Sequence, residues 1–108
     1  MPSYILTAYD APNSLEKRLA TREAHLEYIK ELSQAGKAIL GGAVMDDKDQ
    51  MIGSVIFFSM TADEMEVYKT KEPYIIAGVW QEIKIQEAKF GDFFLANIAD
   101  RYNKQATA

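Results

Sequence analysis

Hydrophobic residues recur at helical spacing between Asn13 and Gly36, and this pattern predicts one long amphipathic helix. Asn13 is suited to the N-cap, with Glu16 in the capping-box position, and Gly36 stands where a helix commonly ends. The apolar arc of this helix is formed by Leu15, Leu19, Leu26, Ile29 and Leu32. Most of its charged residues fall on the opposite arc.

Three strongly polar residues interrupt the apolar side of the same helix. Arg22 lies near its middle, His25 lies near one edge, and Arg18 also projects from it. A helix that serves only packing would rarely place two guanidinium groups and a histidine there. This side of the helix is therefore the first place to look for a functional site.

The rest of the chain predicts four strands and a second helix. The second helix opens with a capping box, Thr61 to Glu64, and ends before Pro73 because the residue that precedes a proline is pushed out of the helical region. The strands are expected at Ser3–Tyr9, Lys37–Val44, Met51–Ser59 and Val79–Gln86, and the second helix at Ala62–Lys71. Gly41 and Gly42 interrupt the second strand, which indicates a bulge or a close approach of another group to the backbone.

The order of these elements is β-α-β-β-α-β, which is typical of the α+β, ferredoxin-like split βαβ arrangement with both helices on one face of an antiparallel sheet. Both faces of the predicted sheet are nevertheless apolar. Ile5 and Thr7 point to one side of the first strand while Leu6 and Ala8 point to the other. Because two helices can cover only one face, we expect the second to pair with another copy of the chain as a homodimer or a larger assembly.

We divide the chain into a domain over residues 1–88 and a helical extension of the same domain over residues 89–108. Within the extension we expect a helix at Asp92–Asn103. Its apolar stripe would comprise Phe90, Phe94, Ile98 and Tyr102.

Composition narrows the class of protein. The sequence is 48% hydrophobic and 26% charged, with a net charge of −4, which argues against nucleic acid or an anionic membrane as a partner. It contains no cysteine and a single histidine, so thiolate chemistry and a multi-histidine metal site are excluded, although a carboxylate site for a hard cation is not. No cofactor or zinc motif is present, and we expect neither. The amino-terminal apolar run is too short for a signal peptide or a membrane span, so we expect a cytoplasmic protein.

His25 is the first candidate for chemistry, because an unperturbed imidazole can exchange protons near neutral pH. Its carboxylate partner could be Glu72, at the end of the second helix, or Asp10, which ends the first strand. The alternative is a half-buried histidine bonded to a carbonyl, with Glu72 an exposed acid and Asp10 a turn residue.

Arg18 and Arg22 are candidates for binding a carboxylate, enolate or phosphate oxygen of a substrate. The alternative is that their aliphatic stems cover apolar surface while each guanidinium reaches water or a neighbouring acid. We favour that alternative for Arg18, whereas Arg22 lies deeper in the apolar arc.

Several segments resemble the YCII-related (YciI-like) family. They are Leu15–Ile29, the glycine-interrupted strand after Gly36-Lys37, the strand that begins Met51-Ile52-Gly53-Ser54, and the stretch from Glu72-Pro73-Tyr74 to Ala77-Gly78. The resemblance covers about residues 3 to 86. It implies a ferredoxin-like fold assembled as a dimeric α/β barrel, with an active site built around a histidine and an acid. By position, the histidine is His25, and Arg22 matches the family's preceding arginine.

Two positions depart from the family pattern. The acid before Pro73 is usually aspartate, whereas this chain has the longer Glu72. The family's Gly-Pro in the second strand is replaced by Gly42-Ala43. A shift of about 1 Å in a catalytic group can be costly, so the geometry of Glu72 decides whether it serves as the acid.

Three functions remain open, and the polar residues on the first helix make the third, a purely structural dimerisation domain, the least favoured. The first is a small cofactor-free enzyme of the lyase or isomerase type that uses His25 and Glu72 to move a proton on a small anionic or aromatic substrate. The second is a binding or regulatory module that uses the same pocket without turnover.

Overall fold

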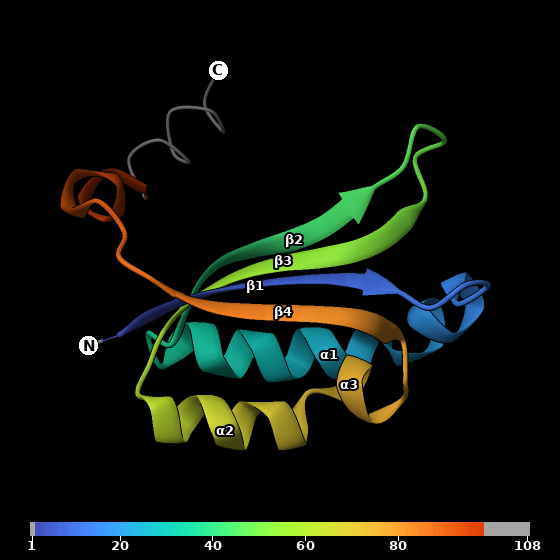
Figure 1. Ribbon diagram of the computed structural model, residues 1–108, viewed down its shortest axis with the longest axis horizontal. Coiled ribbons are helices and arrows are strands. Elements are labelled where there is room, and N and C mark those ends of the chain that lie inside the picture. The colour runs from blue at the N-terminus through green and yellow to red at the C-terminus, as the bar shows by residue number, and fades with distance from the viewer. Residues whose placement is uncertain (1, 99–108) are drawn as a thin grey trace.

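The computed structural model describes residues 2–98, and from Ser3 to Ala88 its seven elements follow the predicted order with one short helix added. The strands are β1 (Ser3–Asp10), β2 (Ala38–Met45), β3 (Met51–Ser59) and β4 (Trp80–Ala88). The helices are α1 (Leu15–Gln34), α2 (Ala62–Lys71) and α3 (Pro73–Ile76). Figure 1 shows the resulting two layers, with α1 and α2 side by side on one face of the sheet.

The sheet has the order β2-β3-β1-β4, and every neighbouring pair is antiparallel. This is the ferredoxin-like arrangement that the element order predicts. The two central strands, β1 and β3, are separated in the sequence by α1 and β2, and β4 joins beside β1. The carboxyl-terminal end of β1 therefore lies next to the start of β4, where Asp10 pairs with Trp80 after a register shift.

The core lies between the sheet and the helices. Leu6 and Ala8 of β1 face the helices with Ile56 and Phe58 of β3, and all four are at most 2% exposed. The other buried hydrophobic residues are Ala38, Met60, Met65, Tyr68, Tyr74, Val79 and Trp80. Burial of this cluster is the main favourable contribution to folding.

Helix α2 begins as predicted. The Thr61 side chain accepts the Glu64 N–H at 3.1 Å, and the Glu64 carboxylate accepts the Thr61 N–H at 2.8 Å. The capping box expected at the start of α1 is wrong: Ser14 is its N-cap residue, without a side-chain cap bond, and Asn13 has a φ of 59°. Asparagine tolerates this left-handed conformation, so Asn13 turns the chain into the helix and does not cap it.

The buried side of α1 also differs from the predicted apolar arc. Leu19 and Leu26 are 54% and 43% exposed, whereas Arg18 and His25 are buried. The helix is thus rotated so that polar side chains face the sheet near its amino-terminal half, and Ile29 and Leu32 pack on the core further along. None of the helices in the described residues is both long and apolar enough to cross a membrane.

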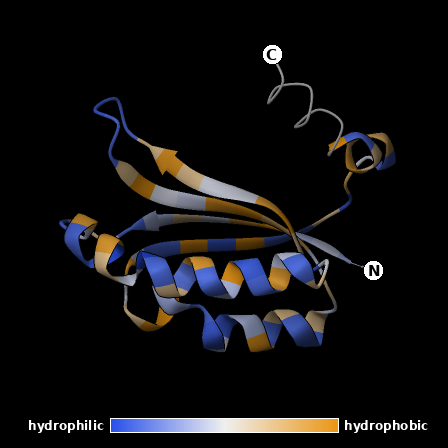
Figure 2. Cartoon of the chain, turned by 180° about the vertical axis from the view of Figure 1, so that it is seen from behind, coloured by the Kyte–Doolittle hydropathy of each residue, from blue (hydrophilic) through white to orange (hydrophobic). Residues whose placement is uncertain are grey.

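The face of the sheet opposite the helices is apolar over three strands. Ile5 pairs with Phe57, Thr7 with Val55, and Leu40 of β2 also pairs with Phe57, so these side chains share that face. Figure 2 shows hydrophobic positions recurring along the strands while both helices lie on the other side. Leu40 is 52% exposed. We call the surface formed by Ile5, Thr7, Leu40, Val55 and Phe57 the outer sheet face.

Beyond β4 the chain leaves the sheet. Phe90 packs edge-on against Phe57, with ring centroids 5.5 Å apart, and residues 92–98 are helical. This segment lies beyond the end of the sheet in Figure 1. The remainder of the expected helix at Asp92–Asn103, including Tyr102, lies outside the described residues.

Candidate functional site

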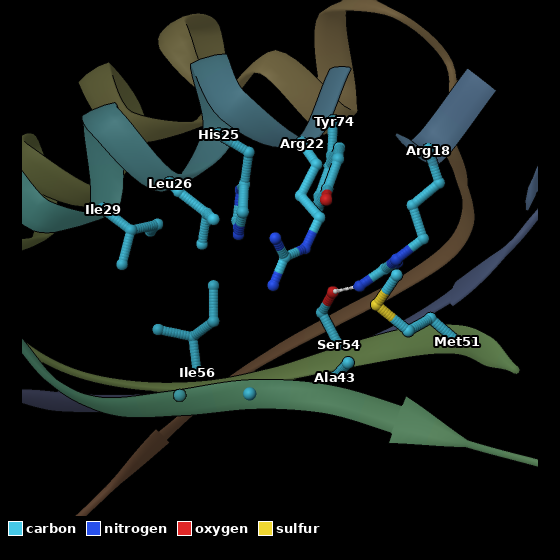
Figure 3. Close-up of a pocket in the computed structure, with 12 residues that line it drawn as sticks. Arg18, Arg22, His25, Leu26, Ile29, Ala43, Met51, Ser54, Ile56 and Tyr74 are labelled. Atoms are coloured by element: carbon cyan, nitrogen blue, oxygen red, sulfur yellow. Dashed lines mark hydrogen bonds between the residues drawn. The ribbon is translucent and has the colours of Figure 1, made fainter. Parts of the chain in front are cut away.

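A cavity of about 290 Å³ lies between the amino-terminal half of α1 and the sheet. In Figure 3 the side chains of α1 extend downward into the cavity, and the residues of β2 and β3 lie beneath them. Its lining combines Arg18, Arg22, His25, Leu26, Ile29 and Tyr74 with Gly41, Gly42, Ala43, Met51, Ser54 and Ile56. The glycine pair of β2 thus forms part of the floor of the cavity. A Cβ atom at Gly41 would lie 3.2 Å from the Val55 carbonyl oxygen, whereas the close approach expected at Gly42 is absent, because a Cβ atom there would meet nothing within 4 Å of the described chain. The chemistry of the cavity depends on its few polar side chains.

His25 and Glu72 form a buried pair at this cavity. The Nδ1 atom of His25 lies 2.6 Å from Oε1 of Glu72, and the glutamate is fully buried. The two residues are far apart in the sequence, and the packing of α1 beside α3 brings them together. Glu72, rather than Asp10, is therefore the carboxylate beside the imidazole.

The backbone holds Glu72 in place. Glu72 ends α2 and caps α3 in an extended conformation, with φ −63° and ψ 117°, as expected for a residue that precedes proline. Its Oε1 also accepts the backbone N–H of Tyr74 at 3.1 Å. The glutamate side chain thus folds back over the start of α3, and this conformation places its carboxylate beside His25 although glutamate is one methylene longer than aspartate.

This pairing sets the orientation of the imidazole. A carboxylate only accepts hydrogen bonds, so Nδ1 carries the proton that is donated to Glu72. The other ring nitrogen, Nε2, then lies on the side of the ring that faces the cavity (Figure 3). In the neutral imidazole that nitrogen has a free lone pair, which is what a general base requires.

Arg18 anchors the opposite end of the cavity. Its guanidinium binds both oxygens of Asp10, at 2.9 and 3.1 Å, and donates to the Ser54 hydroxyl at 3.0 Å. Trp80 donates its indole N–H to the same hydroxyl at 3.2 Å. Arg18 is 2% exposed, and its buried Nε has no hydrogen-bond partner in the described residues. A paired, buried arginine agrees with the alternative favoured from the sequence.

Arg22 differs from Arg18. Its guanidinium extends from α1 into the space between His25 and Ser54, as Figure 3 shows, and makes no ion pair with any residue that the structure describes. Its positive charge is thus available to a molecule in the cavity.

Tyr74 forms the wall between the two ends of the site. Its ring stacks on His25 at a centroid distance of 4.0 Å, and the Arg18 guanidinium carbon lies 4.8 Å from its centroid. Burial raises the pKa of the Tyr74 hydroxyl, and the charges of Arg18 and Arg22 oppose that rise. Tyr74 therefore stays neutral while it holds the imidazole ring flat against it.

Asp10 does not line the cavity. It lies behind Arg18, and burial raises the pKa of its carboxyl while the guanidinium beside it acts in the opposite direction. Asp10 therefore holds Arg18 in place and would not contact a molecule in the cavity directly. Within residues 2–98, no group of three or more His, Asp or Glu side chains could hold a metal ion.

Three polar contacts were not anticipated from the sequence. Tyr68 donates its hydroxyl to Oε2 of Glu72 at 2.6 Å, and Ser54 joins Arg18 to Trp80. Two signals could have found them. Tyr68 stands four residues before Glu72 near the end of a helix, a spacing at which side chains meet. Ser54 shares its strand face with Ile56 and Phe58, where a polar residue needs a partner.

The fold and the site together define a class of protein: a small ferredoxin-like α+β domain with a histidine–carboxylate pair in a basic cavity. The chain belongs to the YCII-related domain family, whose model matches residues 3–89.

Sequence relatives cover the same part of the chain. An uncharacterized protein of Haemophilus influenzae is 31% identical over 93 residues, which span 80% of this chain and 95% of the relative. The protein YciI of Escherichia coli O6:H1 is 29% identical over 93 residues, which span 80% of this chain and 95% of that protein.

Solved structures confirm the fold. A 5-chloro-2-hydroxyhydroquinone dehydrochlorinase, TftG, from Burkholderia phenoliruptrix, solved in complex with 2,5-dihydroxybenzoquinone, superposes with a TM-score of 0.74 and 25% identity. The match covers 84% of this chain and 97% of TftG. A dimeric ferredoxin-like protein of unknown function from Bacteroides fragilis has a TM-score of 0.51 and 16% identity, covering 82% and 95% of the two chains.

Proposed function

We propose that this protein is a small enzyme of the lyase or isomerase type in which His25 moves a proton on a small anionic or aromatic substrate. One observation carries the proposal: Glu72 binds Nδ1 of His25 at 2.6 Å, and the other ring nitrogen faces a cavity. A histidine oriented by a buried carboxylate is the usual arrangement for a general base.

The charges around the cavity support an anionic substrate. Arg18 and Arg22 line the cavity. The two nearby acids do not line it, because Asp10 binds Arg18 and Glu72 binds His25 on the side away from the cavity. The volume of about 290 Å³ is at the small end of ligand cavities, which suits a molecule with a single ring.

The proposed step assigns a role to each group. Nε2 of His25 takes a proton from a C–H or O–H bond of the substrate, and the electron pair of that bond moves into the conjugated system. Arg22 stabilises the oxygen that gains negative charge. Glu72 fixes the imidazole and stabilises the imidazolium that forms. In a lyase reaction the electron pair then expels a leaving anion; in an isomerase reaction the proton returns at another atom.

The likeness to TftG supports the choice of a first compound to test. TftG is a dehydrochlorinase solved with 2,5-dihydroxybenzoquinone, a single-ring dihydroxy compound that can ionise. A compound of this kind matches both the charge and the size of the cavity described above.

The test measures binding and turnover separately. Binding of 2,5-dihydroxybenzoquinone would be followed by calorimetry, and turnover of 5-chloro-2-hydroxyhydroquinone by chloride release. We expect His25→Gln to lower kcat by roughly 10²- to 10⁴-fold with little change in binding, because only the proton transfer is lost. Arg22→Gln should weaken binding about tenfold or more, because a charge-assisted contact is removed.

Tyr28→Phe serves as the control variant, because Tyr28 does not line the cavity. Binding without turnover in the native protein would favour the binding or regulatory module. If His25→Gln turned over chlorinated substrate as fast as the native protein, the role of His25 would be wrong.

The same family and fold support a homodimer through the outer sheet face. This face is apolar and lies opposite the helices, and the Bacteroides fragilis protein of the same fold is dimeric. Pairing two such faces would bury apolar surface that is otherwise in contact with water.

A further inference from the structure

The hydroxyl of Tyr68 lies 2.6 Å from Oε2 of Glu72, whereas His25 contacts the other oxygen, Oε1. We infer that Tyr68 is a positioning residue, which holds the second oxygen of Glu72 so that only Oε1 is presented to the imidazole. This inference rests on the proposed function in that the positioned group is the proposed base. Its structural content can be tested without any substrate.

The contacts of Glu72 use both carboxylate oxygens. Oε1 accepts from His25 and from the Tyr74 N–H, and Oε2 accepts from Tyr68. The side chain is fully buried, so water cannot replace a missing donor. Without the Tyr68 hydroxyl, one oxygen of a buried carboxylate would have no partner, and the group would be driven to rotate toward a new one.

Tyr68 is itself held firmly. Its ring stacks on Tyr28 at a centroid distance of 5.9 Å and packs on Phe58 at 4.7 Å, and the residue is 1% exposed. Tyr68 also lies one helical turn before Glu72, whose backbone N–H bonds the Tyr68 carbonyl at 3.0 Å. The donor and the acceptor therefore belong to one rigid unit at the end of α2.

Electrostatics keep this hydroxyl a donor. Burial raises the pKa of Tyr68 strongly, and the adjacent Glu72 carboxylate raises it further. Tyr68 consequently keeps its proton across the pH range in which proteins are usually assayed. Its contribution to the site is to fix the geometry of Glu72 and, through it, which nitrogen of His25 carries a proton.

The experiment uses the single histidine of the chain as a probe. The ring nitrogens of ¹⁵N-histidine-labelled protein report which tautomer is present. We expect the native protein to show the Nδ1–H form alone at pH values where the imidazole is neutral. Tyr68→Phe, which removes only the hydroxyl, should populate the Nε2–H form measurably. Tyr28→Phe removes the neighbouring hydroxyl of the same stack and should leave the native pattern.

A second readout applies if turnover is found. Tyr68→Phe should lower kcat roughly tenfold or more with KM nearly unchanged, because the base is misplaced while the binding groups remain. A packing role would instead lower thermal stability without changing the tautomer. An unchanged tautomer in a folded Tyr68→Phe protein would overturn the inference, whatever the activity.

The outcomes separate this inference from the proposed function. A changed tautomer together with no turnover or binding in the native protein would refute the proposed function and leave the positioning intact. If Tyr68→Phe did not fold, the native protein would decide: the hydroxyl proton of Tyr68 should give a slowly exchanging, downfield signal at low temperature. Its absence would overturn the inference.

Discussion

Gly53 lies where β3 passes close to β1, and it has no room for a side chain. A Cβ atom there would stand 2.4 Å from the carbonyl oxygen of Ala8, which is backbone and cannot rotate away. We expect Gly53→Ala to lower the free energy of unfolding by about 1–3 kcal/mol or more, because the two central strands must separate locally. Urea denaturation of the two proteins measures this difference.

Gly42→Ala is the matched control, since a Cβ atom at Gly42 would meet nothing within 4 Å. There we expect a gain of about 0.4–1 kcal/mol, because alanine restricts the unfolded chain more than glycine does. Similar losses in both variants would show that close approach at Gly53 is not the cause.

Single residues differ in how far the sequence could predict their roles. The helical wheel singled out Arg18, Arg22 and His25 because polar groups on an apolar arc are conspicuous. Their partners were harder to assign. Whether His25 would meet Glu72 or Asp10 depended on how α1 rotates over the sheet, which no local pattern determines. The Tyr68 hydroxyl was missed because a tyrosine in a buried helix face is accounted for by packing alone.

At the scale of elements, the signals that reside within one segment were reliable. The capping box of α2 and the bounds of β3 agree with the prediction because they depend on neighbouring residues only. The cap of α1 did not agree, since Asn13 instead adopts the left-handed conformation that the turn from β1 requires. The buried arc of α1 is shifted toward the edge that carries Arg18 and His25, where Arg18 forms its ion pair with Asp10.

The capping box of α2 gives the domain a dependence on pH. Hydrogen bonds from Lys37 and from the Thr61 N–H lower the pKa of Glu64 below the value near 4.5 of an unperturbed glutamate. A carboxyl whose pKa is lower in the folded state contributes stability above its unfolded pKa, and this is lost as pH falls through the folded-state value. We expect Glu64→Gln to remove the part of the loss of stability at acid pH that comes from Glu64. Urea unfolding midpoints measured between about pH 2 and 6 test this expectation.

Glu66→Gln is the control for this prediction. Glu66 lies on the same helix and its substitution removes the same charge, but Glu66 is exposed and, among residues 2–98, its ion pair is with Lys69 alone. Equal changes in slope for the two variants would attribute the effect to net charge rather than to the cap.

At the scale of the whole molecule, the order of strands and helices was enough to predict the ferredoxin-like fold, and the apolar second face predicts assembly. We expect the native protein to be dimeric and Leu40→Lys to weaken the dimer at least tenfold, because a charge would be placed in the outer sheet face. Sedimentation at a series of concentrations measures the dissociation constant.

Leu19→Lys provides the comparison. Leu19 is exposed to a similar degree, 54% against 52% for Leu40, but it lies on α1. It should leave the dissociation constant unchanged. A monomeric native protein, or equal weakening by both variants, would contradict pairing through the outer sheet face.

The strand order has a consequence for synthesis of the chain. The inner strand β1 is made first, yet its neighbour β4 is made last, and Trp80 at the start of β4 holds the Ser54 hydroxyl that binds Arg18. A nascent chain that already contains both His25 and Glu72 still lacks this edge strand and its hydrogen bond to Ser54. Contacts so distant in sequence also form slowly. The residues that line the cavity thus all precede β4 in the chain, and the hydrogen bond from Trp80 to Ser54 is the contact that is added after them.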